Sequence, residues 1–165
     1  MDKEVISAKL EALRHCIQRI RDKTPASAAI LLEDYDLQDI ICLNLERAVQ
    51  TCVDLASHII AESDLPAAAS MAGSFEQLRR LDLISDELAT RMRRAVGFRN
   101  VAVHAYQAVN WNVVYAIITT RLTDFVDFAR VIARAAKLYL PGARLAKLTV
   151  RDSEGALQSC ALNLY

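Results

Sequence analysis

The sequence predicts an all-α protein, an up-and-down bundle of four main helices and one short helix. Hydrophobic residues make up 53% of the 165 positions, while only four Gly and three Pro occur, so the residues that punctuate β-rich folds are scarce. Apolar side chains recur every three or four residues, which is the period of an amphipathic helix. No apolar run approaches the roughly 18 residues that a membrane span needs. We expect one helical domain over residues 1–138 that acts in the cytoplasm without membrane contact.

The first two main helices follow from their apolar stripes. The first should end near Lys23, because Pro25 disfavours helical geometry at the residue before it and lacks a backbone N–H. The second should begin at an N-cap, Asp36, and run to about Ala61. The stripes consist of Ile6, Leu10, Leu13, Ile17 and Ile20 in the first helix and of Leu37, Ile41, Leu45, Ala48, Cys52 and Ile59 in the second.

A loop and a short helix come next. Residues 62–73 have no sustained apolar period and contain Pro66 and Gly73, which predicts a connecting loop. Ser74 with Gln77 three residues later has the spacing of a capping box. This pair predicts that the short helix begins at the serine.

Two more main helices complete the bundle. Ser85 should cap a third main helix that ends within residues 99–106, and Gly97 inside it should let a neighbouring backbone pack closely. Asn110 should cap a single last helix that reaches about Leu138. The tail, residues 139–165, changes character after a Pro-Gly pair, and three interpretations stay open: a strand-like arm, a disordered terminus and a vector-derived remnant.

The charge of the chain is balanced overall and uneven locally. Twenty basic and twenty acidic side chains cancel, which excludes a protein that coats nucleic acid by bulk charge alone. Residues 79–99 nevertheless hold six arginines against three acids, a local surplus of three positive charges. This basic segment, with Arg94 near its end, is either an ordinary solvated helix face or the electrostatic support of a neighbouring site.

The four cysteines do not indicate a disulfide framework or a metal site. They show no C-x-x-C pair, and no histidine lies at zinc-finger spacing from them. Clusters of acids and histidines that would hold a catalytic metal are also missing from the sequence. We expect reduced thiols, no metal and no cofactor.

Residues 99–106, RNVAVHAY, gather the polar side chains that carry chemistry: Arg99, Asn100, His104 and Tyr106. Histidine gives and takes protons near neutral pH, and arginine is a permanent planar cation suited to phosphate. Together they suit metal-independent cleavage of an RNA phosphodiester, with the imidazole moving protons and the guanidinium stabilising the charge on phosphate oxygens.

The helical geometry of this segment favours a dimer. Asn100 and His104 share a helix face, whereas Arg99 and His104 lie about 140° apart around the axis. One histidine cannot readily serve as acid and base on opposite sides of a phosphate. A twofold homodimer would bring two copies of both side chains into one cleft.

Simpler interpretations of the same residues remain open. His104 would cap helix carbonyls, and Arg99 would pair with Glu46 or Asp54. Tyr106 would be an ordinary core aromatic with a solvated hydroxyl. Trp111 would anchor the last helix, or stack on an RNA base. On the second main helix, His58 would pair with the aspartate one turn before it.

The pattern R-x4-H-x-Y, here Arg99, His104 and Tyr106, resembles the signature of HEPN-domain ribonucleases, specifically the HepT-like toxins. MRRAVGFRNVAVHAYQAVNWNVV is similar to that family's motif helix and following turn, and LQDIICLNLERAVQTCVDLASHII to its second helix. The resemblance covers about residues 1–138. It implies a homodimeric helical bundle and metal-independent endoribonuclease activity, with Arg99 and His104 catalytic and Asn100 orienting the histidine or the RNA.

The resemblance also implies a partner and a means of silencing. HepT-like toxins are usually encoded beside MntA-like antitoxins, minimal nucleotidyltransferases that transfer AMP from ATP to the motif tyrosine, which here is Tyr106. Each AMP would add negative charge and bulk beside Arg99 and so block RNA. The alternative hypothesis is a noncatalytic module that binds a nucleotide or a nucleotidyltransferase. A third is a purely structural helical dimer.

Overall fold

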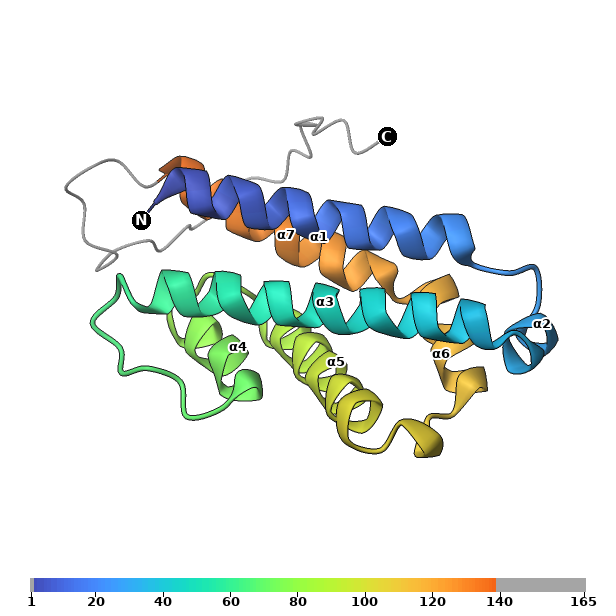
Figure 1. Cartoon of the computed structure of the whole chain (residues 1–165). Coiled ribbons are helices and arrows are strands. Elements are labelled where there is room, and N and C mark those ends of the chain that lie inside the picture. Colours follow the sequence, from blue (N-terminus) through green and yellow to red (C-terminus); the bar gives the residue numbers. More distant parts are fainter. Residues whose placement is uncertain (1, 139–165) are drawn as a thin grey trace.

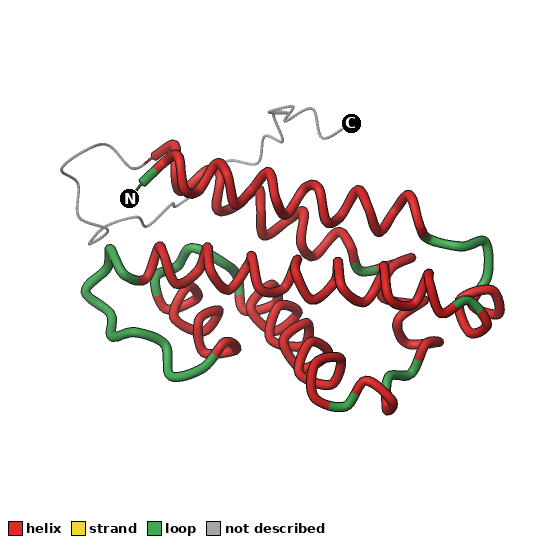
Figure 2. The backbone as a smooth tube through the Cα atoms, in the orientation of Figure 1, coloured by secondary structure: helices red, strands yellow, loops and turns green. Residues whose placement is uncertain are grey.

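A computed structural model describes residues 2–138, and every regular element in this range is helical (Figure 1; Figure 2). The predicted tail, residues 139–165, lies outside the described residues. The elements in chain order are α1 (Lys3–Lys23), α2 (Ala28–Glu33), α3 (Tyr35–Ile60), α4 (Met71–Arg80), α5 (Asp86–His104), the 3-10 helix η1 (Tyr106–Ala108), α6 (Trp111–Thr120) and α7 (Leu122–Leu138).

Helices α1, α4, α5 and α7 pack around α3. Helices α1 and α7 run side by side in opposite directions along one side of α3, while α4 and α5 cover its other side (Figure 1). Half of the residues of α3 are buried, as expected for a helix contacted from several directions. An edge-to-face pair of rings, Phe75 on α4 and Phe128 on α7, joins the two sides of the core at a centroid distance of 5.6 Å. The all-α up-and-down bundle is therefore confirmed.

Local capping signals placed several helix ends correctly. The Ser85 side chain accepts a hydrogen bond from Leu88 N, and the Asn110 side chain accepts from the backbone N–H groups of Asn112 and Val113. Helix α1 ends at Lys23, as predicted from the proline two residues later.

Two predicted helix starts were wrong. Helix α3 is capped by Asp34, whose Oδ1 accepts from Leu37 N at 2.9 Å, and not by Asp36, which lies in the first turn. Helix α4 begins at Met71 with Ser70 as its cap, so Ser74 is a buried residue inside the helix. In both cases an earlier side chain with the same capping chemistry reaches the free N–H groups first.

The chain also contains two local features that the apolar pattern did not predict. Helix α2 is only six residues long, too short to show a period. The single last helix is divided at Arg121 (φ −118°, ψ 0°) into α6 and α7. Thr119 and Thr120 precede the break, and their hydroxyls bond to carbonyls one turn back, which competes with regular helix geometry. Arg121, at this break, lines a pocket together with residues of α5.

Gly97 does not have the predicted packing role. A Cβ atom at this position would meet no other atom within 4 Å, so no neighbouring backbone approaches it. Gly97 is exposed on α5. Within the described range, no helix is both long and apolar enough to cross a membrane.

Candidate functional site

The polar segment lies at the C-terminal end of α5, as predicted. The helix ends at His104 because Ala105 leaves helical geometry (φ −146°, ψ 51°), although its N–H still donates to Val101 O at 2.8 Å. The chain then makes the single turn of η1, beginning at Tyr106, before α6 starts. The last turns of α5 and the turn after it, which carry these polar residues, thus lie at one edge of the bundle (Figure 1).

The catalytic candidates are available to a ligand. His104 and Asn100 are exposed, and Arg99 is half-buried. Among residues 2–138, the side chains of Arg99 and His104 form no hydrogen bond or ion pair, including with each other. Val101 and Val103, which are 42% and 43% exposed, lie beside them. An unengaged imidazole and guanidinium flanked by exposed apolar side chains are typical of a binding surface.

The simpler interpretations of Arg99 and His58 are not supported by the contacts. Asp54, a proposed partner of both, is held by Lys9 Nζ at 2.9 Å and by Gln50. Within residues 2–138, Arg99 does not pair with Glu46 either. His58 Nε2 instead accepts a hydrogen bond from Asp2 N at 3.3 Å.

Tyr106 is fixed on α3 by a hydrogen bond that the sequence did not reveal. Its Oη donates to Asp39 Oδ1 at 2.6 Å, and its ring meets the edge of Trp111 at a centroid distance of 5.6 Å. Burial raises the pKa of the Tyr106 hydroxyl above its ordinary value, and the hydrogen bond to Asp39 and the charges of Asp39 and Glu46 raise it further. The phenol is therefore held in its protonated form, with 40% of the residue exposed.

Asp39 and Glu46 are site residues that sequence reasoning missed. They lie seven positions apart on one face of α3, with Cys42 between them. The Cys42 thiol donates to Glu46 Oε1 at 3.5 Å, and burial raises the pKa of this thiol to about 12. The sequence spacing shows that Asp39 and Glu46 share a helix face. It cannot show that Tyr106, 67 positions after Asp39, packs on this face.

Trp111 takes the anchoring role. It is half-buried at the start of α6 and packs against the hydrophobic core as well as Tyr106. The tryptophan thereby joins η1 to the start of α6.

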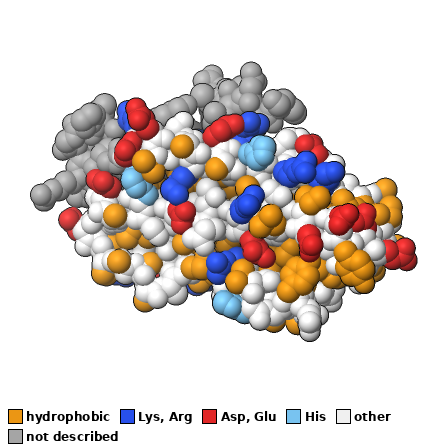
Figure 3. All heavy atoms as spheres, in the orientation of Figure 1, with side chains coloured by type: hydrophobic (Ala, Val, Ile, Leu, Met, Phe, Trp, Pro, Cys, Tyr) orange, Lys and Arg blue, Asp and Glu red, His pale blue; other side chains and the backbone are white. Residues whose placement is uncertain are grey.

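Three of the six arginines of the basic segment form ion pairs within the fold. Arg79 pairs with Glu76 and Asp86, Arg93 with Glu76, and Arg91 with Asp124 at 3.2 Å. Arg94 forms no ion pair with the described part of the chain. Figure 3 shows basic and acidic side chains interspersed on the visible face, with hydrophobic side chains gathered toward the end where α2 and α6 lie. Charges of both signs are therefore mixed on this face, as the balanced composition predicts.

The described residues include no group of three or more His, Cys, Asp or Glu side chains placed to hold a metal ion. The thiols of Cys16, Cys42 and Cys52 are buried and free.

Comparison with known proteins identifies the family. The family model of ribonuclease HepT-like proteins matches residues 13–132, which include the polar segment and its partner face on α3. The chain belongs to the ribonuclease HepT-like family. This HepT-like chain is 34% identical to the mRNA nuclease HepT of Shewanella oneidensis over 129 residues, 78% of this chain and 96% of that protein. It is 23% identical to the tRNA nuclease HepT of Aphanizomenon flos-aquae over 126 residues, 76% of this chain and 86% of that protein.

Solved structures agree with this assignment. The HepT-like chain superposes on the tri-AMPylated HEPN toxin of Shewanella oneidensis, solved in complex with MNT antitoxin, with a TM-score of 0.75 and 34% identity over 81% of this chain and 99% of that one. A toxin–antitoxin structure with AMP-PNP gives a TM-score of 0.74 and 33% identity over 80% and 99% of the two chains. The resemblance inferred from the motif is therefore confirmed.

Proposed function

We propose that this HepT-like chain is the toxin of a HEPN/MNT toxin–antitoxin pair and acts as a metal-independent endoribonuclease, with Arg99 and His104 as its catalytic residues. The observation that supports it best is the exposed end of α5, where these two side chains have no partner within residues 2–138. Two relatives are named as an mRNA nuclease and a tRNA nuclease, so the class of RNA differs within the family.

The chemistry follows from the two side chains. His104 takes the proton of a ribose 2′-hydroxyl while O2′ forms a bond to phosphorus and the bond from phosphorus to O5′ breaks. The leaving O5′ receives a proton from the second imidazole of the dimer, and the products are a 2′,3′-cyclic phosphate and a 5′-hydroxyl. Arg99 stabilises the growing charge on the phosphate oxygens, the task that a metal ion performs in other nucleases.

The proposed homodimer places two polar segments face to face. The exposed Val101 and Val103 supply apolar surface beside the imidazole, and a twofold axis near them would bring both copies into one cleft. Asn100, exposed on the same helix face as His104, orients the imidazole or holds the RNA. Arg94 adds positive charge nearer the N-terminal end of α5.

Silencing by an MntA-like nucleotidyltransferase fits the surroundings of Tyr106. The Tyr106 oxygen attacks the α-phosphorus of ATP, its proton passes through the Asp39 carboxylate to solvent, and pyrophosphate leaves, so the side chain carries AMP. The modified oxygen can no longer donate to Asp39, and its phosphate is repelled by Asp39 and Glu46. The adduct would therefore leave the α3 face and occupy the space beside Arg99. The relative described as tri-AMPylated supports this proposal.

Cleavage of RNA in a chelating buffer tests the proposed activity. We expect the purified protein to cut RNA without added metal and the His104→Ala variant to lose about 10²-fold or more of the rate, as is typical for a general acid or base. His15→Ala is the matched control, because His15 is also exposed but lies on α1. Full activity of His104→Ala would overturn the assignment. Intact RNA together with nucleotide binding would instead support a noncatalytic binding module.

A further inference from the structure

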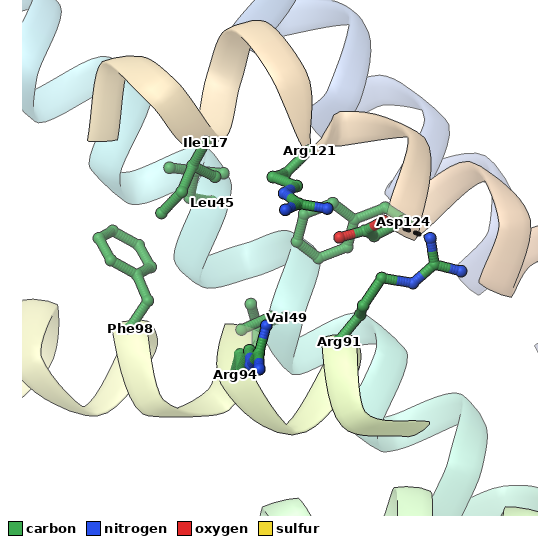
Figure 4. Close-up of a pocket in the computed structure, with 10 residues that line it drawn as sticks. Leu45, Val49, Arg91, Arg94, Phe98, Ile117, Arg121 and Asp124 are labelled. Carbon is green, nitrogen blue, oxygen red and sulfur yellow. Dashed lines mark ion pairs between the residues drawn. The ribbon is translucent and has the colours of Figure 1, made fainter. Parts of the chain in front are cut away.

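A pocket separate from the polar segment lies where α5 faces the corner between α6 and α7 (Figure 4). Its volume is about 180 Å³, and α3 forms its floor. The apolar part of the lining consists of Leu45, Val49, Ala95, Phe98, Ile117 and Phe125. In Figure 4 the Phe98 ring stands at one end of the space, toward Leu45 and Ile117.

Three arginines from two elements border the apolar floor. Arg91 and Arg94 lie one turn apart on α5, and Arg121 reaches in from the break between α6 and α7. Asp124 is the single acid in the lining, and its Oδ1 is 3.2 Å from Nη1 of Arg91. Arg94 and Arg121 form no ion pair with any described residue. The lining thus carries two more positive than negative charges.

Arg91 also has an unused hydrogen-bond donor. Its Nε is buried and has no acceptor among residues 2–138, although its Nη1 is paired with Asp124. A buried donor without a partner is costly and uncommon in folded proteins. An acceptor supplied by a ligand would remove this cost.

These features together match the chemistry of a nucleotide. Guanidinium groups bind phosphate through paired N–H donors, and a flat base packs well against an aromatic ring and apolar side chains. The volume is below the roughly 300 Å³ of pockets that hold drug-sized ligands, so the pocket would enclose one base and one phosphate, and any further part of the ligand would lie outside it.

We propose that this pocket binds a single nucleotide, with its phosphate on Arg91, Arg94 and Arg121 and its base against Phe98. The nucleotide comes either from a single-stranded RNA or from a free mononucleotide such as ATP or AMP. The RNA source rests on the proposed nuclease function. Arg94 precedes His104 by ten residues, about 15 Å along the axis of α5 and about 80° around it, so a strand cut at His104 would curve around α5 to place a nearby nucleotide in the pocket.

Two binding titrations distinguish the sources. A labelled single-stranded RNA oligonucleotide is titrated in a chelating buffer with the full-length His104→Ala protein, and ATP and AMP are titrated in parallel with the unsubstituted protein. We expect Arg94→Ala and Arg121→Ala, added to each of these two proteins, each to weaken binding about tenfold, as removal of one charged hydrogen-bonding partner commonly does. Arg19→Ala on α1 removes the same charge outside the pocket and should change binding less than twofold. Phe98→Leu keeps an apolar side chain and should still weaken binding if a base stacks there.

Each outcome supports or overturns the proposal. If Arg94→Ala and Arg121→Ala weaken the binding of RNA alone, the pocket binds a nucleotide of an RNA strand. If they weaken the binding of ATP or AMP alone, the pocket binds a free nucleotide. Equal effects of Arg94→Ala, Arg121→Ala and Arg19→Ala in every titration would overturn the proposal. These titrations measure binding and not cleavage, so they test the pocket even if the protein proves not to be a nuclease. Circular dichroism spectra that match the parent protein exclude misfolding of the variants.

Discussion

Tyr106 Oη donates a hydrogen bond to Asp39 Oδ1 at 2.6 Å, which fastens the turn after α5 to the first half of α3. The two residues are 67 positions apart, so this bond belongs to the folded state alone. It joins the tyrosine that we expect to be modified to a carboxylate that would repel the modified form. Together with burial, the same bond raises the pKa of the phenol.

The first prediction concerns the acidity of this phenol. Burial and the charge of Asp39 both favour the protonated phenol of Tyr106, and Asp39→Asn removes only the charge. The pKa of Tyr106 should therefore fall toward its ordinary value near 10 and, because of burial, stay above it. Tyrosinate absorbance measured against pH reports the change. Subtracting the titration curve of Tyr106→Phe isolates this ring from the other tyrosines. An unchanged pKa would show that burial alone raises it.

The second prediction concerns the site of AMP transfer. When the protein is produced together with an MntA-like nucleotidyltransferase, intact-mass spectrometry should find AMP on the parent chain and none on Tyr106→Phe. Tyr35→Phe is the control, because Tyr35 is 77% exposed. If exposure does not select the target, this variant should carry as much AMP as the parent protein. An adduct that persists in Tyr106→Phe would place the modification on another residue.

Local chemistry in the sequence was enough to predict part of this arrangement. The caps Ser85 and Asn110 bond to backbone groups within three residues, so their spacing alone reveals them. The resemblance, anchored in a short motif at the end of α5, led to the correct family. Asp39 could not be predicted as a partner of Tyr106, because the contact depends on how α5 and η1 pack on α3.

The break at Arg121 shows a second kind of limit. The apolar period continues across it, since Ile118 and Leu122 are both buried, and a pattern of buried positions does not report a change of axis. Because the sequence does not reveal the break, it could not predict that Arg121 lies in one pocket with Arg91 and Arg94. The pocket was thus absent from the sequence analysis, although Arg94 was already expected to support RNA binding.

The third prediction uses Gly97, which sits inside α5 with free space around it. Alanine has a higher helix propensity than glycine, so Gly97→Ala should raise the free energy of unfolding by about 0.5–1 kcal/mol. Urea denaturation followed by circular dichroism measures the difference. The residue shares an exposed helix face with Asn100 and His104, so a destabilised Gly97→Ala protein would indicate that another chain packs closely there.

The fourth prediction is a loss of stability at high pH. Burial raises the pKa of Cys42 from its ordinary value of 9.0 to about 12, so between these values the folded state keeps a proton that the unfolded chain releases. The stabilising contribution is complete below pH 9 and is lost as the pH rises toward 12. Urea denaturation at a series of pH values should show a shallower decline for Cys42→Ala than for the parent chain. Parallel curves would mean that Cys42 does not titrate differently in the two states.

The fifth prediction separates charge from geometry at Arg99. Lysine keeps the positive charge but lacks the planar pair of N–H donors, so Arg99→Lys should retain only part of the activity, while Arg99→Ala should lose about 10²-fold or more. Because the guanidinium is proposed to act on charge that develops during the reaction, the loss should fall on kcat more than on KM. Steady-state cleavage of a short RNA by both variants, with Arg19→Ala as the charge control, measures this split. A rise in KM with unchanged kcat would make Arg99 a residue that only binds RNA, and His104 would then lack the electrostatic partner that the proposed reaction requires.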